Sequence, residues 1–284
     1  MELNHLVTVA AMLAEAIAMV WGAKQLWGLV LQRDMNHELT SQDNPAAALT
    51  LAGYFLGVFI ALAGVAASPS QGLAQDLIAF ALFGAAGVAV LFLSVFVAPL
   101  IGGIRLQRDI VEHHNTSAGL VLAATFVATG LIFNGAVRGE GTGVAAWVAL
   151  LVFQALGQAV LGIVAHLFER ITPFNMHREI VEGKNVAAAA GYAGAMVAMG
   201  IIVHNAVLGD IATLRADWGA EVRTFLIWCA PLLLLWPVRA LLVNGLLLGF
   251  RNLDHEISQD RNLGVGVLEA VTYIGFAWLV MAVA

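Results

Sequence analysis

Long apolar stretches alternate with short charged clusters along the whole chain of 284 residues. The clusters separate eight apolar stretches, each as long as the roughly 20 residues that an α-helix needs to cross a bilayer core of ~30 Å. The expected spans are residues 6–31, 46–67, 73–101, 117–137, 143–168, 186–208, 221–248 and 264–284. The longest polar connection, near residues 169–185, has room for a short interfacial helix but not for a catalytic domain. This pattern predicts an all-α membrane protein with eight transmembrane helices.

The composition agrees with this prediction. Hydrophobic residues make up 61% of the chain and charged residues only 11%, whereas soluble domains carry about 25% charged residues. The only cysteine, Cys229, lies in an apolar run, which excludes an intramolecular disulfide. We therefore expect the lipid bilayer as the main partner, with no nucleic-acid partner and no cofactor.

The basic residues predict the orientation of the chain, because Lys and Arg near helix ends collect on the cytoplasmic side. The connections after the first, third, fifth and seventh stretches hold most of them: Arg33, Arg105, Arg108, Arg170, Arg178, Lys184, Arg251 and Arg261. The opposite connections hold Arg138, Arg215 and Arg223. The bias predicts a multi-pass protein of a bacterial inner membrane with both termini in the periplasm.

One motif occurs four times, each time just before an even-numbered span. It reads His or Arg, then Asp or Glu, then Leu or Ile, four variable residues and Asn, as in HELTSQDN, RDIVEHHN, REIVEGKN and HEISQDRN. Its acids and asparagines are Glu38 and Asn44, Asp109 and Asn115, Glu179 and Asn185, and Glu256 and Asn262. Small residues follow each Asn at the second and fourth positions, which permits close helix approach. The chain is therefore expected to be four two-helix hairpins in one orientation, related by rotation about the membrane normal.

These hairpins resemble the YjfL-like family of bacterial inner-membrane proteins, which is catalogued as a domain of unknown function. Its members look like four-helix units with two acid-to-Asn hairpins, of the kind found here at 38–44 and 109–115. The chain is similar to two such units in tandem, residues 1–140 and 141–284, with further hairpins at 179–185 and 256–262. The resemblance implies an inner-membrane location and a link to envelope-stress and polyamine-related genes. It implies no defined activity.

Each part of the motif suggests its own chemistry. The Asn is a good N-cap for the free backbone N–H groups of the following helix, and Pro45 stands where the first helical residue needs no donor. The acids have two interpretations. They are surface charges paired with the preceding His or Arg, or they converge as an acidic ring at the mouth of a cation pathway. Arg108 and Arg178 would cancel part of the field of such a ring.

Four charged residues lie inside otherwise apolar spans: Glu15, Lys24, Arg239 and Glu269. An unpaired charge there costs at least about 2.5–3.5 kcal/mol on insertion scales. Their expected depths allow Glu269 to pair with Lys24 or Arg239, whereas Glu15 has no evident partner. Such a pair is either a structural bridge that fixes helix register or an ionisable site on a transport pathway.

The sequence contains no Ser-His-Asp, Cys-His, phosphate-loop or dinucleotide motif and no zinc-like spacing, so we expect neither catalytic residues nor metal ligands. Two functions remain, each compatible with a homo-oligomer. The first is conduction or transport of a small ion or solute through the helical bundle. The alternative is a non-transporting membrane scaffold in the envelope-stress response, which docks a cytoplasmic protein through its charged hairpins. A hydrated cavity at the intramembrane charges would favour the first, and a closed bridge would favour the second.

Overall fold

The computed structural model describes residues 2–31, 35–138, 142–207 and 218–283. Within these ranges the regular structure is entirely helical, and eight segments are long and apolar enough to cross a membrane. The predicted all-α class with eight spans is therefore confirmed. The expected boundary between residues 140 and 141, the expected span ends at 208 and 284, and Arg33 and Arg215 lie outside the described residues.

Seven of the spans are continuous helices. They are α1 (Glu2–Leu31), α3 (Pro45–Ala66), α4 (Leu73–Gly102), α5 (Thr116–Ala136), α6 (Val144–Ile171), α7 (Val186–Ala206) and α12 (Leu263–Val283). Four shorter helical turns precede the even-numbered spans: α2 (Met35–Thr40), the π-helical turns η1 (Leu106–Glu112) and η2 (Arg178–Glu182), and α11 (Leu253–Ser258). The turn η2 occupies the connection in which a short interfacial helix was expected.

The seventh span is broken into segments. It consists of α9 (Trp218–Cys229), the 3₁₀ turn η3 (Ala230–Leu234), α10 (Leu235–Pro237) and the π-helix η4 (Val238–Leu247). Two prolines, Pro231 and Pro237, lie at the joints. Proline has no N–H to donate, so the α-helical hydrogen-bond ladder is interrupted at each. The wider π-helix follows directly and carries Arg239, one of the intramembrane charges.

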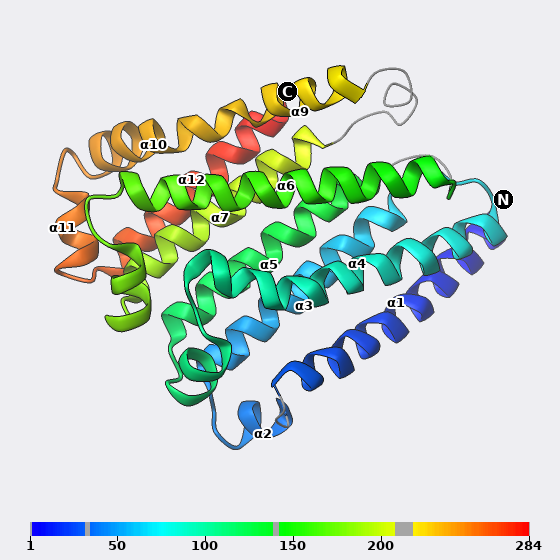
Figure 1. Ribbon diagram of the computed structural model, residues 1–284, viewed down its shortest axis with the longest axis horizontal. Coiled ribbons are helices and arrows are strands. Elements are labelled where there is room, and N and C mark those ends of the chain that lie inside the picture. Colours follow the sequence, from blue (N-terminus) through cyan, green and yellow to red (C-terminus); the bar gives the residue numbers. More distant parts are fainter. Residues whose placement is uncertain (1, 32–34, 139–141, 208–217, 284) are drawn as a thin grey trace.

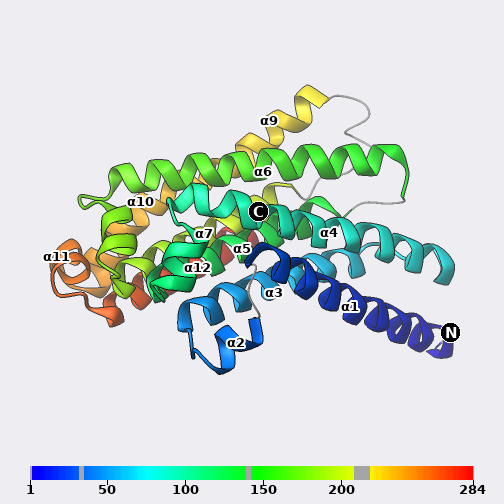
Figure 2. The same ribbon diagram turned by 60° about the horizontal axis from the view of Figure 1, so that its bottom comes forward.

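The helices form two layers. The helices α3, α5, α7 and α12, here called the inner helices, lie side by side in sequence order, since α3 packs on α5, α5 on α7 and α7 on α12 (Figure 1). The other spans lie against them as outer spans. Helix α4 contacts α3 and α5, α6 contacts α5 and α7, and the seventh span contacts α7 and α12 (Figure 2). Each of these three outer spans thus covers two neighbouring inner helices.

Small residues bring the backbones of the inner helices into contact. A Cβ added to Gly119 of α5 would lie 2.6 Å from the Ala46 carbonyl oxygen of α3, and one added to Gly200 of α7 would lie 2.7 Å from Ala128 Cα of α5. Any larger side chain at these positions would force the helices apart, as at other small-residue interfaces in membranes. The middle of the layer is the most enclosed. In the apolar 18-residue core of each span, 89% of the residues of α7 are buried, against 28% of those of α12.

Candidate functional site

The four acid-to-Asn motifs form four equivalent turns at one end of the bundle, here called the motif end. In each turn the Asn N–H donates to the carbonyl of the motif acid six residues earlier, at 2.8–3.1 Å. The residue before each Asn is left-handed, with φ between 46° and 52° at Asp43, His114, Lys184 and Arg261. A left-handed residue of this kind commonly ends a helix. The short turn therefore stops and the inner helix begins directly after it.

Every motif Asn caps its inner helix. The side-chain oxygens of Asn44 and Asn185 each accept two backbone N–H groups at 3.0 and 3.1 Å. Asn115 and Asn262 each accept one, from Ala118 at 3.2 Å and from Val265 at 3.3 Å. The capping role inferred from sequence is thus present in all four repeats, and it satisfies donors that would be costly to leave unpaired at a membrane boundary.

The amide nitrogen of the Asn has a second role, which joins neighbouring repeats. In the first three repeats it donates to the main-chain carbonyl of the Ile that follows the next repeat's acid. The pairs are Asn44 with Ile110 at 2.9 Å, Asn115 with Ile180 at 2.9 Å, and Asn185 with Ile257 at 2.8 Å. We call this bond the repeat clasp. Sequence reasoning missed it, because spacing within one repeat carries no information about which backbone group lies opposite.

Three of the four motif acids bond the amide group of their own Asn. Glu38, Glu179 and Glu256 accept a hydrogen bond from that amide nitrogen at 3.2, 3.0 and 2.9 Å. The shorter Asp109 instead accepts the Arg105 backbone N–H and the Arg108 guanidinium, each at 2.7 Å. This bond raises the pKa of Arg108 above its usual range. The spacing of six residues between acid and Asn therefore has a structural purpose.

In the second repeat the motif acid forms the expected ion pair with the preceding residue, Arg108 with Asp109 at 2.7 Å. In the third repeat Arg178 lies 3.8 Å from Glu182, and in the fourth His255 lies 3.7 Å from Asp260. Glu179 and Glu256 each accept a hydrogen bond from the amide of their own Asn. Neither of the two cavities described below includes a motif acid.

The structure places Arg239 against Glu269 in the membrane interior. The Arg239 Nε donates to Glu269 Oε1 at 2.7 Å, and its Nη2 donates to Asp254 Oδ1 at 2.5 Å. The Tyr273 hydroxyl donates to the same Glu269 oxygen at 2.9 Å. Glu269 is 2% exposed and Arg239 is 8% exposed. On α7, Gly191 makes room for the carboxylate, since a Cβ there would collide with Glu269 Oε2.

The other intramembrane charges stay outside this cluster. Lys24, the alternative partner considered for Glu269, is exposed on α1. Glu15 is half-buried, and its Oε2 has no hydrogen-bond partner among the described residues. Sequence reasoning did not include Asp254 or Tyr273 in the cluster. Tyr273 could have been found, because it lies one helical turn after Glu269 on the same face.

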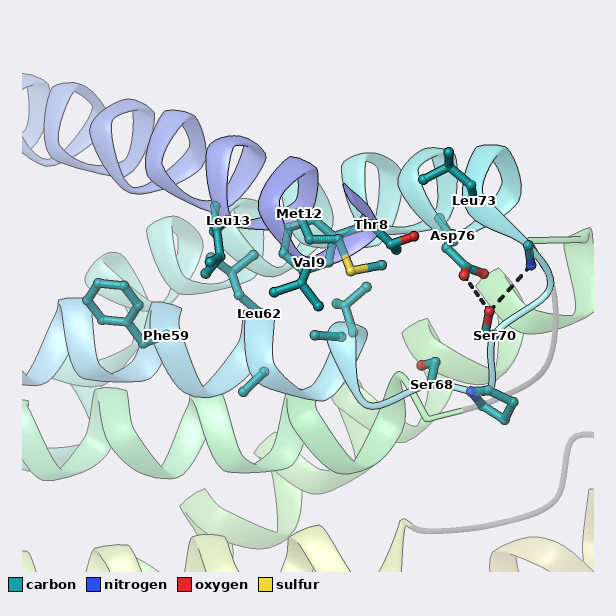
Figure 3. Close-up of a pocket in the computed structure, with 18 residues that line it drawn as sticks. Thr8, Val9, Met12, Leu13, Phe59, Leu62, Ser68, Ser70, Leu73 and Asp76 are labelled. Atoms are coloured by element: carbon teal, nitrogen blue, oxygen red, sulfur yellow. Dashed lines mark hydrogen bonds between the residues drawn. The ribbon is translucent and has the colours of Figure 1, made fainter. Parts of the chain in front are cut away.

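Two cavities lie at the end opposite the motifs. The larger, of about 770 Å³, lies between α1, α3 and α4, where Met12 and Leu13 of α1 face Leu62 of α3 (Figure 3). At its rim Asp76 accepts a hydrogen bond from Ser70 at 2.5 Å. The smaller, of about 160 Å³, lies beside it. Neither cavity is lined by α7, α12 or the seventh span, so neither reaches the Arg239–Glu269 pair.

Comparison with known proteins places the chain among membrane proteins without an assigned activity. It is 23% identical over 274 residues to a protein of Aquifex aeolicus (strain VF5) described as "UPF0719 transmembrane protein", over 94% of this chain and 97% of the relative. No solved structure matches. The model of the Domain of Unknown Function (DUF350) matches residues 1–137 and again residues 142–284. The resemblance to a domain of unknown function in two tandem copies is confirmed, and the chain belongs to the DUF350 family.

Proposed function

We propose that the protein is a non-transporting membrane scaffold whose motif end docks a cytoplasmic protein. The observation that carries this proposal is the closed bridge of Arg239 with Glu269 and Asp254, completed by Tyr273. An ionisable residue on a transport pathway has to meet water or substrate at some stage. Here the two most buried of the four intramembrane charges bond to each other and to other protein groups, which supports a role in fixing helix register.

The inner layer supports the same conclusion. Its backbones meet at small residues along three successive interfaces, such as Gly119 with Ala46 and Gly200 with Ala128. Close contact of this kind fills the space in which a pathway between inner helices would run. One observation favours transport instead: Gln154 of α6 is buried, and neither of its amide atoms has a hydrogen-bond partner among the described residues.

The motif end offers a docking surface. The side chains of Arg178 and Glu182 are 77% and 68% exposed, and those of His255 and Asp260 are 57% and 53% exposed. The repeat clasps and the hydrogen bonds within each motif turn hold these charges on short, well-defined turns, so little conformational entropy is lost when a partner binds. The bias of Lys and Arg supports a cytoplasmic position for this surface in a bacterial inner membrane. The YjfL-like resemblance points to envelope stress as the setting.

Flux measurements test the absence of transport. Purified protein in proteoliposomes is expected to pass protons, alkali cations and polyamines no faster than empty liposomes do. Glu269→Gln should leave this baseline unchanged while lowering stability. Flux above that of empty liposomes, which falls in a folded Glu269→Gln variant, would contradict the proposal and support transport.

Photocrosslinking in cells tests docking. A photoactivatable amino acid at position 182 should give a discrete adduct with a soluble protein, and one at position 100 should give none, because Leu100 is exposed on the membrane-spanning helix α4. The adduct at position 182 should disappear when Arg178 and Lys184 are both replaced by Glu. Equal adducts at both positions, or none at 182, would rule out the docking role.

A further inference from the structure

The inner layer ends in two exposed faces that are built like its internal interfaces. We propose that copies of this chain associate head to tail through these faces, with α12 of one copy packing on α3 of the next. This inference goes beyond the scaffold role and does not rest on it. Its basis is the geometry of three internal contacts that share one register.

Each internal contact joins a leading face to a trailing face. The leading face holds the residues 2, 9 and 13 positions after the motif Asn, and the trailing face of the next inner helix holds those 4, 8 and 15 positions after its own Asn. The contacts that show this register are Ala46 with Gly119, Gly53 with Ala123, Gly57 with Gly130, Ala128 with Gly200, Ala187 with Gly266, and Gly194 with Ala270. The two faces differ, so the layer has direction.

The two ends of the layer expose one face each. On α12 the leading-face residues Gly264, Val271 and Gly275 are exposed, and on α3 the trailing-face residues Ala48, Ala52 and Phe59 are exposed. Continuing the register would set Ala48 against Gly264, two small residues, as at every internal interface. It would set Phe59 against Gly275, which leaves room for the ring. The end faces are therefore complementary in the order that the internal faces establish.

Asn262 differs from the other motif asparagines in its amide contacts. Its amide donates to Glu256 at 2.9 Å, and among the described residues it has no main-chain acceptor in another repeat. It is exposed, whereas the other three motif asparagines are 1% exposed. The acceptor equivalent to Ile110, Ile180 and Ile257 would be the carbonyl of Leu39, the residue after Glu38. In the proposed assembly a second copy of the chain supplies this carbonyl.

Helix α1 lacks an inner neighbour on one side. Only 6% of the residues in its apolar 18-residue core are buried. The corresponding shares for α4, α6 and the seventh span are 44%, 39% and 33%. The larger cavity lies along the open side of α1 and borders the exposed stripe of α3 at Phe59 and Ala63 (Figure 3). In the proposed assembly, α12 of the neighbouring copy packs on this stripe of α3 and contacts the open side of α1.

Contact between two different faces makes the association heterologous. A copy bound through α12 still offers its own α3, so copies add until a ring closes. Inner helices of successive copies would then form one continuous layer, with a repeat clasp from Asn262 to Leu39 at every junction.

Disulfide crosslinking tests the register. In a Cys229→Ala background, chains carrying Ala48→Cys are mixed with differently tagged chains carrying Gly264→Cys and oxidised in membranes. Crosslinks between the two kinds of chain should form readily, whereas each kind alone should give few. The control is Leu100→Cys mixed with Gly264→Cys. Leu100 is exposed and lies near the end of α4 that leads into the motif end, outside the proposed interface.

A matched pair of tryptophan variants tests the interface without disturbing the fold. A Cβ at Gly275 and one at Gly162 of α6 each have no neighbour within 4 Å. Gly275→Trp should abolish oligomers counted by single-molecule photobleaching in vesicles, and Gly162→Trp should leave them unchanged. Asn262→Ser keeps the cap and removes the amide donor, so it should weaken association roughly two- to tenfold.

Two results would overturn the proposal. One is a protein that stays monomeric at all densities in vesicles. The other is an oligomer in which Gly275→Trp and Gly162→Trp behave alike and the Ala48 and Gly264 cysteines crosslink no better than the Leu100 control.

Discussion

At the scale of single residues, the motif Asn does several tasks with one side chain. In Asn185 the oxygen caps α7, and the nitrogen donates both to Glu179 and to Ile257 of the next repeat. A Ser or Asp could cap the helix, but neither could donate in the same way. Asn44 combines the same three tasks, which accounts for the acid six residues before the Asn in the first and third repeats.

The buried ion pair gives a prediction at this scale. Glu269→Gln should lower the free energy of unfolding by roughly 3 kcal/mol, because it leaves the Arg239 charge buried with Asp254 as its remaining anion. Replacing both members, as Arg239→Met with Glu269→Leu, should recover at least half of that loss, since no buried charge remains. Reversible unfolding in mixed micelles measures both. A double variant less stable than Glu269→Gln would contradict a purely structural bridge.

Some residue roles were predictable and others were not. The caps at Asn44, Asn115, Asn185 and Asn262 follow from local sequence, because a cap bonds backbone groups two or three residues away. The partner of Glu269 could be narrowed by depth to Lys24 or Arg239. Choosing between them required the rotation of α1 and of the π-helix η4, which periodicity does not determine. The clasp from Asn185 to Ile257 depends on a tertiary contact between repeats, which the spacing of residues within one motif does not indicate.

At the scale of elements, small residues decide how the helices pack. Span positions followed from hydropathy, and the predicted start of α5 at residue 117 differs from the observed Thr116 by one residue. The order of packing did not follow, because an apolar helix in a bilayer shows little difference between its protein-facing and lipid-facing sides. The positions of Gly53, Gly57, Gly130 and Gly200 determine which helix faces pack together. Their role can be recognised only once the interfaces are known.

Two glycines of similar local structure should therefore respond differently to substitution. Gly200→Leu should destabilise the protein by at least about 1–3 kcal/mol, because the side chain would overlap Ala128 of α5. Gly162→Leu faces open space and should change stability by about 0.5 kcal/mol or less. Thermal unfolding in detergent compares them. Similar losses in the two variants would mean that the inner helices do not meet at Gly200.

At the scale of the whole molecule, the chain is a directional layer of four inner helices with outer spans packed against it. The family model matches each half of the chain, and the equivalent register at α3–α5, α5–α7 and α7–α12 shows that the junction between halves is built like the contact within each half. Such a layer has one end at α3 and another at α12. Its charged motif end and its opposite end face different sides of the membrane.

Cysteine labelling tests the orientation of this layer. In a Cys229→Ala background, Thr142→Cys should react with an impermeant thiol reagent in intact cells, and Glu182→Cys should react only after the membrane is opened. Both side chains are exposed at opposite ends of the bundle. The expected sides follow from the Lys and Arg bias. Labelling of Glu182→Cys in intact cells would reverse the proposed topology and remove the docking surface from the cytoplasm.

The most direct test of the account compares the four motif asparagines in one measurement. Each is replaced by Ser, which retains the cap and loses the amide donor, and unfolding is measured in detergent at a dilution where the protein is monomeric. Asn44→Ser, Asn115→Ser and Asn185→Ser should each cost about 1–3 kcal/mol, because each leaves a buried carbonyl of the next repeat without its donor. Asn262→Ser should cost about 0.5 kcal/mol or less, because its amide has no such carbonyl acceptor among the described residues. Equal losses at all four positions, or a loss at none of the first three, would contradict the clasp on which the layer depends.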